Sequence, residues 1–364
     1  MKTDEPIGAL ETVATFDGPM PTGVTVSHTG RIFVNYPKWG DEVPATVTEV
    51  TDGRCVPYPD QLRNAPTADD DRNAFVSVQS VVVDPLDRLW VLDTGSPMFK
   101  PTKTGGPKLV CVDLATDTVR QSIVFPPEVA LPTTYLNDVR FDLRRGDAGA
   151  AFITDSSDQG PNGIIIVDLA TGESWRRLHD HPSTKAEPLH TYRPVVEGRY
   201  FMKRPPGAEP QPVTMGSDGI AISADGTRLY YCPLMSRRLY SVDVEALWNR
   251  TLDDAAVAAT VVDEGDKGTA SDGLESDDAG RLYLTAYEHN AVLRRTADGR
   301  YDTLVHDPRL LWPDTMSVGT DGYLYVTANQ LHRQPLYQHG KDLRDRPYAL
   351  FRVRIDAGPV LLRT

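Results

Sequence analysis

Residues 217–231 read Ser217-Asp218-Gly219-Ile220-Ala221-Ile222-Ser223-Ala224-Asp225-Gly226-Thr227-Arg228-Leu229-Tyr230-Tyr231. An apolar run, an Asp-Gly turn and a second apolar run are typical of a β-hairpin. The pattern returns with variations along the chain, and the second strands of the copies centre on Ile32, Leu89, Phe152, Leu229, Leu282 and Leu324. All-β repeats of this size indicate a propeller. The sequence therefore predicts an all-β fold, a six-bladed β-propeller with four-stranded blades.

The repeats occupy the whole chain, so we expect residues 1–364 to form a single domain. A β segment at residues 9–16 precedes the first hairpin, and another at residues 348–355 ends the last one. We expect the amino-terminal strand to complete the last blade, because an unclosed ring would leave two open sheet edges. The longest interval between copies contains a proline-rich stretch at about residues 180–213, which we expect to be an insertion over the channel mouth.

Composition limits the classes of partner. The chain has a formal net charge of −13 and no Lys/Arg cluster beyond short pairs, which argues against nucleic acid and anionic membranes. It has no Gly-rich phosphate loop and no nucleotide fingerprint, so we expect a small-molecule ligand and no nucleotide, flavin or haem. Its start lacks the apolar core of a signal peptide, which favours a cytoplasmic protein, or a secreted one if a signal has been removed.

The repeat also predicts where a site would lie. The first strand of each blade lines the central channel, and the residue that opens it shares a face with the residues that follow the second strand. The strand openers are Thr22, Gln79-Ser80, Asn137-Asp138, Asp218, Asp272 and Asp314. The residues after the second strands include Tyr36, Trp39, Tyr287, Glu288, His289, Asn329 and His332. We expect these two sets to converge on one channel mouth, with Tyr192 of the insertion beside them.

Carboxylates open four neighbouring inner strands, at Asp138, Asp218, Asp272 and Asp314. Such groups repel one another unless a cation, a proton or hydrogen bonds compensate. A Ca²⁺ or Mg²⁺ ion held by Asn137, Asp218 and Asp272 would do so. In the alternative, each Asp accepts backbone N–H groups of its own strand or pairs with a neighbouring Arg.

The chemistry expected at such a mouth is proton transfer. Asp218, Asp272, Glu288 and His289 are the candidate catalytic acids and bases, since carboxyl and imidazole groups are the usual proton carriers. Gln79, Asp138, Asp314, Asn329 and His332 are candidate polar contacts to a substrate. The aromatic side chains of Tyr36, Trp39, Tyr192 and Tyr287 are candidates for stacking on a flat ligand.

Several segments carry a family resemblance. They are residues 151–156, Ala-Phe-Ile-Thr-Asp-Ser, with Ser174-Trp175-Arg176 after them; residues 229–236, Leu-Tyr-Tyr-Cys-Pro-Leu-Met-Ser; and Trp312-Pro313-Asp314. Together they resemble the Yellow/major royal jelly protein family, which includes dopachrome-converting enzymes. The resemblance implies a six-bladed propeller and a tautomerase or isomerase acting on a cyclic or quinone-like substrate.

The channel openers resemble a second group. Ser217-Asp218-Gly219 and Ser271-Asp272-Gly273 look like the openers of lactonase propellers related to SMP-30 and gluconolactonase, which use a divalent cation. Asn137 and Asp218 match the Asn and Asp ligand positions of that group, whereas Thr22 stands where its ligand Glu would be. A metal-dependent lactonase or hydrolase is therefore one alternative to the tautomerase. A non-catalytic binder of cationic small molecules is the other, because an acidic, aromatic-lined channel attracts cations.

Overall fold

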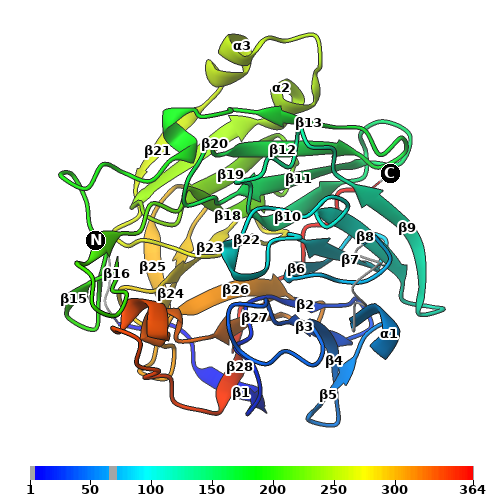
Figure 1. Ribbon diagram of the computed structural model, residues 1–364. Helices are drawn as coiled ribbons and strands as arrows, with labels where there is room; N and C mark the ends of the chain where they lie inside the picture. The colour runs from blue at the N-terminus through cyan, green and yellow to red at the C-terminus, as the bar shows by residue number, and fades with distance from the viewer. Residues whose placement is uncertain (1–4, 65–71, 364) are drawn as a thin grey trace.

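Six four-stranded antiparallel sheets surround a central channel, as Figure 1 shows. The coordinates are a computed structural model, and the structure describes residues 5–64 and 72–363. The innermost strands are β2, β6, β10, β18, β22 and β26, and each is followed in the chain by the next strand outward. The predicted six-bladed propeller with four-stranded blades is confirmed.

The strands of the six blades have the following bounds. Blade 1 contains β2 (Val24–Val26), β3 (Ile32–Asn35), β4 (Val47–Thr51) and β5 (Arg54–Pro57). Blade 2 contains β6 (Val78–Val83), β7 (Arg88–Asp93), β8 (Lys108–Asp113) and β9 (Thr118–Val124). Blade 3 contains β10 (Leu136–Asp142), β11 (Ala150–Asp155), β12 (Gly163–Asp168) and β13 (Ser174–Arg177). Blade 4 contains β18 (Ser217–Ile222), β19 (Arg228–Pro233), β20 (Arg238–Asp243) and β21 (Val262–Asp266). Blade 5 contains β22 (Leu274–Ser276), β23 (Leu282–Ala286), β24 (Ala291–Arg295) and β25 (Tyr301–His306). Blade 6 contains β26 (Pro313–Val318), β27 (Tyr323–Ala328), β28 (Tyr348–Arg354) and β1 (Leu10–Phe16).

Strand β1 closes the ring. It pairs antiparallel with β28, from Leu10 opposite Val353 to Phe16 opposite Tyr348. Figure 1 shows the blue start of the chain beside the red-orange strand β28. Phe16, which is buried, also meets the ring of Tyr36 edge-on at a centroid distance of 6.1 Å. The outer edge of β28 is thereby covered, as expected for a propeller that must hide its sheet edges.

The hairpin turns follow from the Asp-Gly pairs in the repeats. In blade 4 the Gly226 N–H donates to the Ser223 carbonyl at 2.8 Å, and Asp225 accepts from the Ser223 hydroxyl at 2.6 Å. Gly226 has a φ of +71°, a left-handed conformation that costs glycine little. The polar residue before it therefore fixes the turn and the glycine completes it.

The core lies between adjacent blades. Trp90 of β7 stacks on Phe141 of β10 at 5.3 Å and donates its indole N–H to Asp84 at 2.8 Å. Both rings are buried, so this contact joins blade 2 to blade 3 through apolar area and a satisfied polar atom. Cys111 and Cys232 are buried free thiols. None of the helices in residues 5–64 and 72–363 has the length and apolarity of a bilayer span.

Residues 180–213 are an irregular excursion between blades 3 and 4. They contain one 3₁₀ turn and two short hairpins: η2 (Pro182–Thr184), β14 (Val195–Val196) with β15 (Arg199–Tyr200), and β16 (Met202–Lys203) with β17 (Gln211–Pro212). Phe201 anchors the excursion, because its buried ring lies 4.7 Å from that of Trp312 and 4.6 Å from that of Tyr337.

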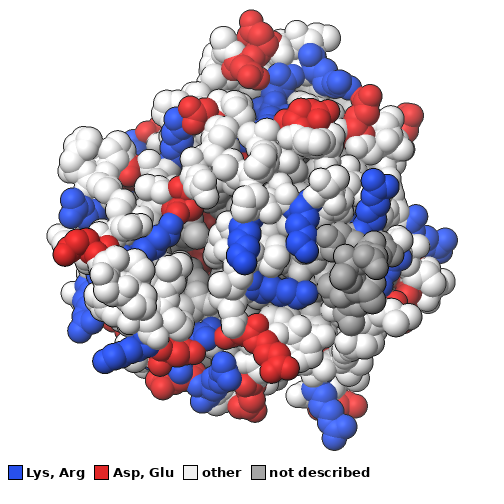
Figure 2. Space-filling view, viewed as in Figure 1, with Lys and Arg blue, Asp and Glu red and all other residues white. Residues whose placement is uncertain are grey.

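Other short elements decorate the blades. They are α1 (Gln61–Asn64), α2 (Val244–Trp248), α3 (Asp254–Ala258), η1 (Pro97–Phe99), η3 (Leu331–Arg333) and η4 (Pro335–Tyr337). Asp243 and Asp253 cap the first turns of α2 and α3 by accepting backbone N–H groups. Figure 2 shows side chains of both charge signs interspersed around the rim of one face.

Candidate active site in the channel

The central feature of the channel is a pair of hydrogen-bonded carboxyl groups. Asp218 on β18 and Asp272, just before β22, bond to each other through their side chains. They are 4% and 7% exposed. Asn137 of β10 donates its amide N–H to Asp218 Oδ2 at 2.8 Å and to Ser156 Oγ at 2.9 Å. Side chains from blades 3, 4 and 5 thus meet here: Asn137, Asp218 and Asp272.

Trp312 fixes the second member of the pair. Its indole Nε1–H donates to Asp272 Oδ2 at 2.6 Å, and its ring is buried. Trp312 has a left-handed backbone with a φ of +58°, as does Gln330 with a φ of +61°. The Gln330 N–H donates to the Leu311 carbonyl, which holds these two segments together. Left-handed non-glycine residues are costly and gather at sites where a side chain must be aimed.

A third carboxyl group lies close to the pair. Asp314 on β26 accepts from the Asn329 amide at 2.5 Å and from the Thr315 hydroxyl at 3.1 Å. It is 5% exposed. The charge of Asp314 raises the pKa of Asp218, and the charge of Asp272 raises the pKa of Asp314. Three acidic side chains from three consecutive blades therefore lie buried close to one another.

Burial raises the pKa of all three groups, and the charge of a nearby carboxylate adds to this in each case, that of Asp138 for Asp272. Burial raises the pKa of Asp272 to about 6, although the hydrogen bonds from Trp312 and Asp218 oppose it. The pKa of Asp218 is raised well above its ordinary value by burial and then by the charges of Asp272 and Asp314. Burial and the charge of Asp272 do the same to Asp314. The raised pKa values favour the protonated forms of these groups, and coupled carboxyl groups release protons as a set.

An aromatic mouth adjoins this cluster. The Tyr135 phenol donates to Gln79 Oε1 at 3.1 Å and accepts from the Trp39 indole N–H at 2.7 Å. Its ring lies 4.7 Å from that of Phe99. Burial raises the pKa of Tyr135 well above its ordinary value, and the charge of Asp218 adds to this. Tyr135 therefore stays neutral as a donor beside the carboxyl groups.

Tyr135 and Phe99 line a cavity of about 300 Å³. Met98, Met215 and Leu336 supply its apolar wall, and Lys203 of the insertion bonds to Asp158 at its edge. Met98 and Phe99 have φ values of +59° and +54°. The strained turn at η1 thus presents two apolar side chains to the cavity. A cavity of this size and lining suits a small flat molecule.

The structure gives Glu288 and His289 other surroundings. Glu288 accepts from Arg237, from the Tyr192 hydroxyl at 2.7 Å and from the Ala270 N–H at 2.8 Å, and the bonds lower its pKa despite burial. His289 is exposed. Neither is brought to the Asp218–Asp272 pair. Tyr192 holds Glu288 in place, so it belongs to the anchoring of the insertion.

Three further candidates from the sequence form contacts with residues outside the carboxyl cluster. Tyr287 is fully buried, stacks on Trp312 at 4.1 Å and donates to the Leu234 carbonyl at 2.7 Å. Tyr36 is buried beside Phe16, with its hydroxyl 3.2 Å from Cys55 Sγ. His332 stacks on Trp312 at 5.7 Å and lies 2.7 Å from Glu197. None of these hydrogen bonds and ring contacts is with Asp218, Asp272 or Asp314.

The residues that follow the second strands hold the strand openers. Asn35 donates to Thr22 Oγ1 at 2.9 Å, and Asn329 holds Asp314. Asp93 accepts from the Val76 and Ser77 N–H groups at 2.6 and 2.9 Å. The two sets do meet, and several residues after the second strands serve to hold the strand openers in place by hydrogen bonds.

Asp138 lies deeper and forms a separate group. It accepts from the Ser80 hydroxyl at 2.6 Å, from its neighbour's N–H and from Arg140 Nη1 at 2.9 Å. Arg140 also reaches the Leu274 carbonyl and lies 3.3 Å from Glu275. For Asp138 the alternative prediction, a carboxylate satisfied by backbone N–H groups and an Arg, describes the arrangement.

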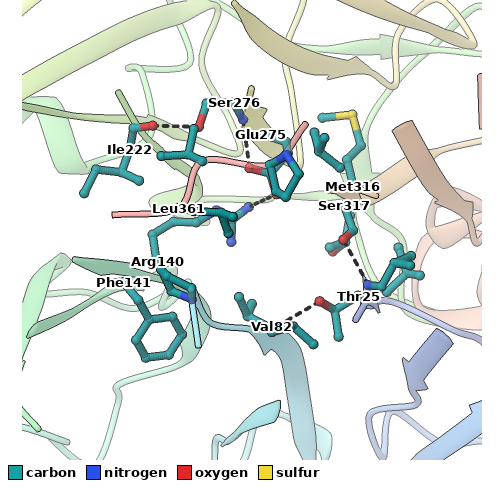
Figure 3. A pocket seen from close by; sticks show the side chains of 18 of the residues that line it. Thr25, Val82, Arg140, Phe141, Ile222, Glu275, Ser276, Met316, Ser317 and Leu361 are labelled. Atoms are coloured by element: carbon teal, nitrogen blue, oxygen red, sulfur yellow. Dashed lines mark hydrogen bonds and ion pairs between the residues drawn. The ribbon is translucent and has the colours of Figure 1, made fainter. Parts of the chain in front are cut away.

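Arg140 and Glu275 line the opposite end of the channel. Figure 3 shows them in a cavity of about 70 Å³, with Leu361 of the carboxyl-terminal segment beside them. That segment crosses from blade 5, where Pro359 bridges to Asp277, to blade 3, where the Leu362 carbonyl accepts from the Leu143 N–H. It then reaches blade 2, where Arg363 donates to the Pro85 carbonyl. The segment therefore covers this end.

The donor set does not fit the divalent cation that the gluconolactonase resemblance implies. Asn137 turns its amide nitrogen toward Asp218, whereas Ca²⁺ and Mg²⁺ take oxygen ligands. Thr22 is occupied by Asn35 and by the Gln79 carbonyl. Within the described residues, no three His, Cys, Asp or Glu side chains are grouped so as to hold a metal ion. The metal site at Asn137, Asp218 and Asp272 stays a prediction.

Three important residues escaped the sequence candidates. Tyr135 and Phe99 form the aromatic mouth, and Arg140 binds Asp138. Arg140 stands two positions after Asp138 on one strand, so the alternation of side chains along a strand could have placed both on the channel side. The positions of Tyr135 and Phe99 depend on loop conformations that no strand pattern predicts.

Comparisons with known proteins agree with this architecture. The profile of the major royal jelly protein family matches residues 76–356. The protein yellow of Drosophila erecta is 29% identical over 362 residues, which cover 94% of this chain and 62% of that protein. The chain therefore spans less than two thirds of the length of the curated relatives it matches.

Solved structures show the same fold at low sequence identity. The calcium-binding protein regucalcin from Agrobacterium tumefaciens has a TM-score of 0.57 at 15% identity, over 97% of this chain and 98% of that one. A gluconolactonase from Xanthomonas campestris has a TM-score of 0.56 at 12% identity, over 95% and 89%. Because the family profile covers most of the sequence, we conclude that this chain belongs to the Yellow/major royal jelly protein family.

Proposed function

We propose that the protein is a small-molecule tautomerase or isomerase whose proton carriers are Asp218 and Asp272. The observation that supports this most is their mutual hydrogen bond in a buried channel, together with the Asp272 pKa of about 6. A carboxyl group with a pKa near the working pH can both take and give a proton. A neighbour that keeps its proton supplies the complementary acid.

The proposed cycle conserves protons. Ionised Asp272 removes a proton from carbon or oxygen of the bound substrate, and protonated Asp218 delivers one to the oxygen or carbon where negative charge develops. The substrate is thereby isomerised with no net gain of protons or electrons. The proton now on Asp272 returns to Asp218 through their hydrogen bond, which restores the starting state. Trp312 stabilises the ionised form of Asp272 by its N–H bond.

The substrate class is proposed from the mouth. The cavity beside Tyr135 and Phe99 combines aromatic and apolar side chains with polar ones such as Lys203, which suits a cyclic, quinone-like molecule such as dopachrome. The neutral Tyr135 phenol would donate to a substrate carbonyl in exchange for its present bond to Gln79. Trp39 and Gln79 hold that phenol in place.

A turnover assay tests the proposal. Dopachrome decolorisation is followed with the wild type, with Asp218→Asn and Asp272→Asn, and with His289→Gln as a control on the exposed loop. We expect both Asn variants to lose at least about 100-fold in kcat/KM, since general acid–base groups contribute that much, and the control to be unchanged. Equal loss in the control, or full activity of Asp272→Asn, would contradict the assigned roles. Tight binding of catecholamines without turnover would support the non-catalytic binder instead.

Elemental analysis separates the lactonase alternative. The wild type and Asp218→Asn are purified without chelator and their Ca²⁺ and Mg²⁺ contents are compared. On the donor set seen here, we expect no stoichiometric cation that depends on Asp218. A cation bound in the wild type and lost in the variant would support a metal-dependent lactonase and redirect the assays to lactones.

A further inference from the structure

A second cavity, of about 470 Å³, lies on the insertion away from the carboxyl cluster. Hairpin β14–β15 forms one wall, with Glu197 and Gly198 in its turn at φ values of +49° and +75°. The segment that follows β27 forms the other wall, with Arg333 and Leu343. The cavity is open to solvent on one side of the insertion.

Two arginines of this cavity lack carboxylate partners. Among the described residues Arg204 is held by backbone carbonyls only: Nη2 donates to Tyr200 O at 2.6 Å, and Nη1 to Met202 O at 3.2 Å and Tyr337 O at 3.4 Å. Arg199 makes no ion pair with any residue in the described part of the chain. The two guanidinium groups are close enough that the charge of Arg199, after burial, lowers the pKa of Arg204. Most arginines on this protein are paired, so an unshielded pair of them is unusual here.

The charges around the cavity do not cancel. Three guanidinium groups line it, at Arg199, Arg204 and Arg333, against the carboxylates of Glu197 and Asp345. Arg333 is bound to both carboxylates, at 2.5 and 3.1 Å. Burial lowers the pKa of His332, which therefore adds no charge at neutral pH. The net charge of +1 is balanced by a monoanion, whereas a dianionic phosphate would leave an excess of negative charge.

The walls favour an organic ligand over a bare inorganic ion. Tyr200 is 55% exposed and Leu343 48% exposed, so apolar surface lines the same cavity as the guanidinium groups of Arg199 and Arg204. A flat carboxylate would place its two oxygens on Arg199 and Arg204 and its body against these side chains. Guanidinium groups suit carboxylates in this way because their N–H groups match the two oxygens.

We propose that this cavity binds a small organic carboxylate between Arg199 and Arg204. The site is independent of the proposed tautomerase chemistry, since none of the residues that contact the Asp218–Asp272 pair lines it. His332 connects the two regions only by stacking on Trp312 at 5.7 Å.

Calorimetric titration of the full chain with benzoate tests the proposal. Benzamide is the neutral counterpart, and inorganic phosphate is the alternative oxyanion. We expect benzoate to bind at one site, Arg199→Gln and Arg204→Gln each to weaken it at least about tenfold, and benzamide to bind far more weakly. Lys185→Gln is the matched control, because it removes one positive charge from the same insertion and Lys185, which pairs with Asp180, lies outside the cavity lining.

The outcomes are distinguishable. No benzoate binding, or binding that Arg199→Gln leaves unchanged, would overturn the site. Phosphate binding more tightly than benzoate, with the same dependence on both arginines, would overturn the assignment to carboxylates. Arg204→Gln also removes bonds to backbone carbonyls, so its fold is checked by circular dichroism. Arg199→Gln removes no bond of the structure and keeps the test decisive if Arg204→Gln unfolds.

Discussion

Asp218 and Asp272 occupy positions that a propeller repeats in every blade, and in this channel they bring two carboxyl groups into direct contact. Other openers have different partners: Asp138 has Arg140, and Asp314 has Asn329. The repeat predicted which residues face the channel. It did not predict their partners, because those depend on side chains from neighbouring blades and from the loops after the second strands.

Removing the indole N–H at Trp312 should shift the titration of the pair. That bond favours ionised Asp272, so Trp312→Phe raises the pKa of the group above about 6. We expect the rising limb of the pH–rate profile to move to higher pH by about one unit. Trp90→Phe is the matched control, since Trp90 makes a similar bond to Asp84 far from the pair. A limb that moves equally in both variants, or in neither, would contradict the role of Trp312.

Asp272 should also make the fold less stable as pH rises. Its folded pKa of about 6 lies above the ordinary 3.8, so the folded state binds more protons than the unfolded state between these values. The free energy of unfolding therefore falls as pH rises through this window. Asp272→Asn lacks this loss, and we expect its stability relative to the wild type to increase from pH 4 to pH 7 by about 2 kcal/mol.

Urea unfolding at several pH values measures this difference. Asp298→Asn is the control, because hydrogen bonds from Thr296 and Arg300 lower the pKa of that exposed group to about 2. Its effect should have the opposite sign, with stability lost relative to the wild type at neutral pH. A constant difference between Asp272→Asn and the wild type across the range would show that Asp272 is ionised throughout.

At the scale of elements, the amino-terminal strand and the existence of the insertion were predictable, and the path of the insertion was not. Residues 9–16 carry a strand pattern with no partner nearby in sequence, and closure of the ring supplies the partner. The insertion lacks periodicity, and its course is set by single anchors such as Phe201 against Trp312 and Glu288 against Arg237. Glu288 is a carboxyl group that follows a second strand beside the channel, which explains why sequence alone suggested a catalytic role for it.

Ring closure should depend on the inward face of β1. Phe16 is buried, so Phe16→Ala leaves a cavity beside Tyr36 and should lower the free energy of unfolding by about 3–5 kcal/mol. Thr15→Ala changes the adjacent exposed position and should cost little. Thermal unfolding measures both. Equal, small effects would mean that β1 contributes little to closure.

At the scale of the whole molecule, the carboxyl-terminal segment covers the end of the channel that lies away from the aromatic mouth. The carboxyl-terminal segment contacts blades 5, 3 and 2 and lies beside the cavity of Arg140 and Glu275 in Figure 3. Burial raises the pKa of Glu275 to about 7, although Arg140 opposes this. The repeats could not predict this cover, because the segment lies outside them.

Truncation after Gly358 should uncover that end. Leu362 is 4% exposed and packs among residues of blades 3 and 4, so its loss alone should cost about 2–4 kcal/mol. We expect a lower Tm for the truncated chain and increased hydrogen exchange at β10 and β22. Leu361→Ala, at a half-exposed position of the same segment, is the milder control. An unchanged Tm after truncation would show that the segment is only loosely attached.

The most direct test of the account concerns the proton shared by Asp218 and Asp272. Infrared difference spectra of the wild type minus Asp272→Asn, recorded from pH 4 to pH 8, isolate the protonated carboxyl band of the pair. We predict that the Asp272 part of this band persists above pH 5 and disappears with an apparent pKa near 6. Complete ionisation below pH 5 would contradict the proton-sharing pair, and with it the proposed tautomerase chemistry.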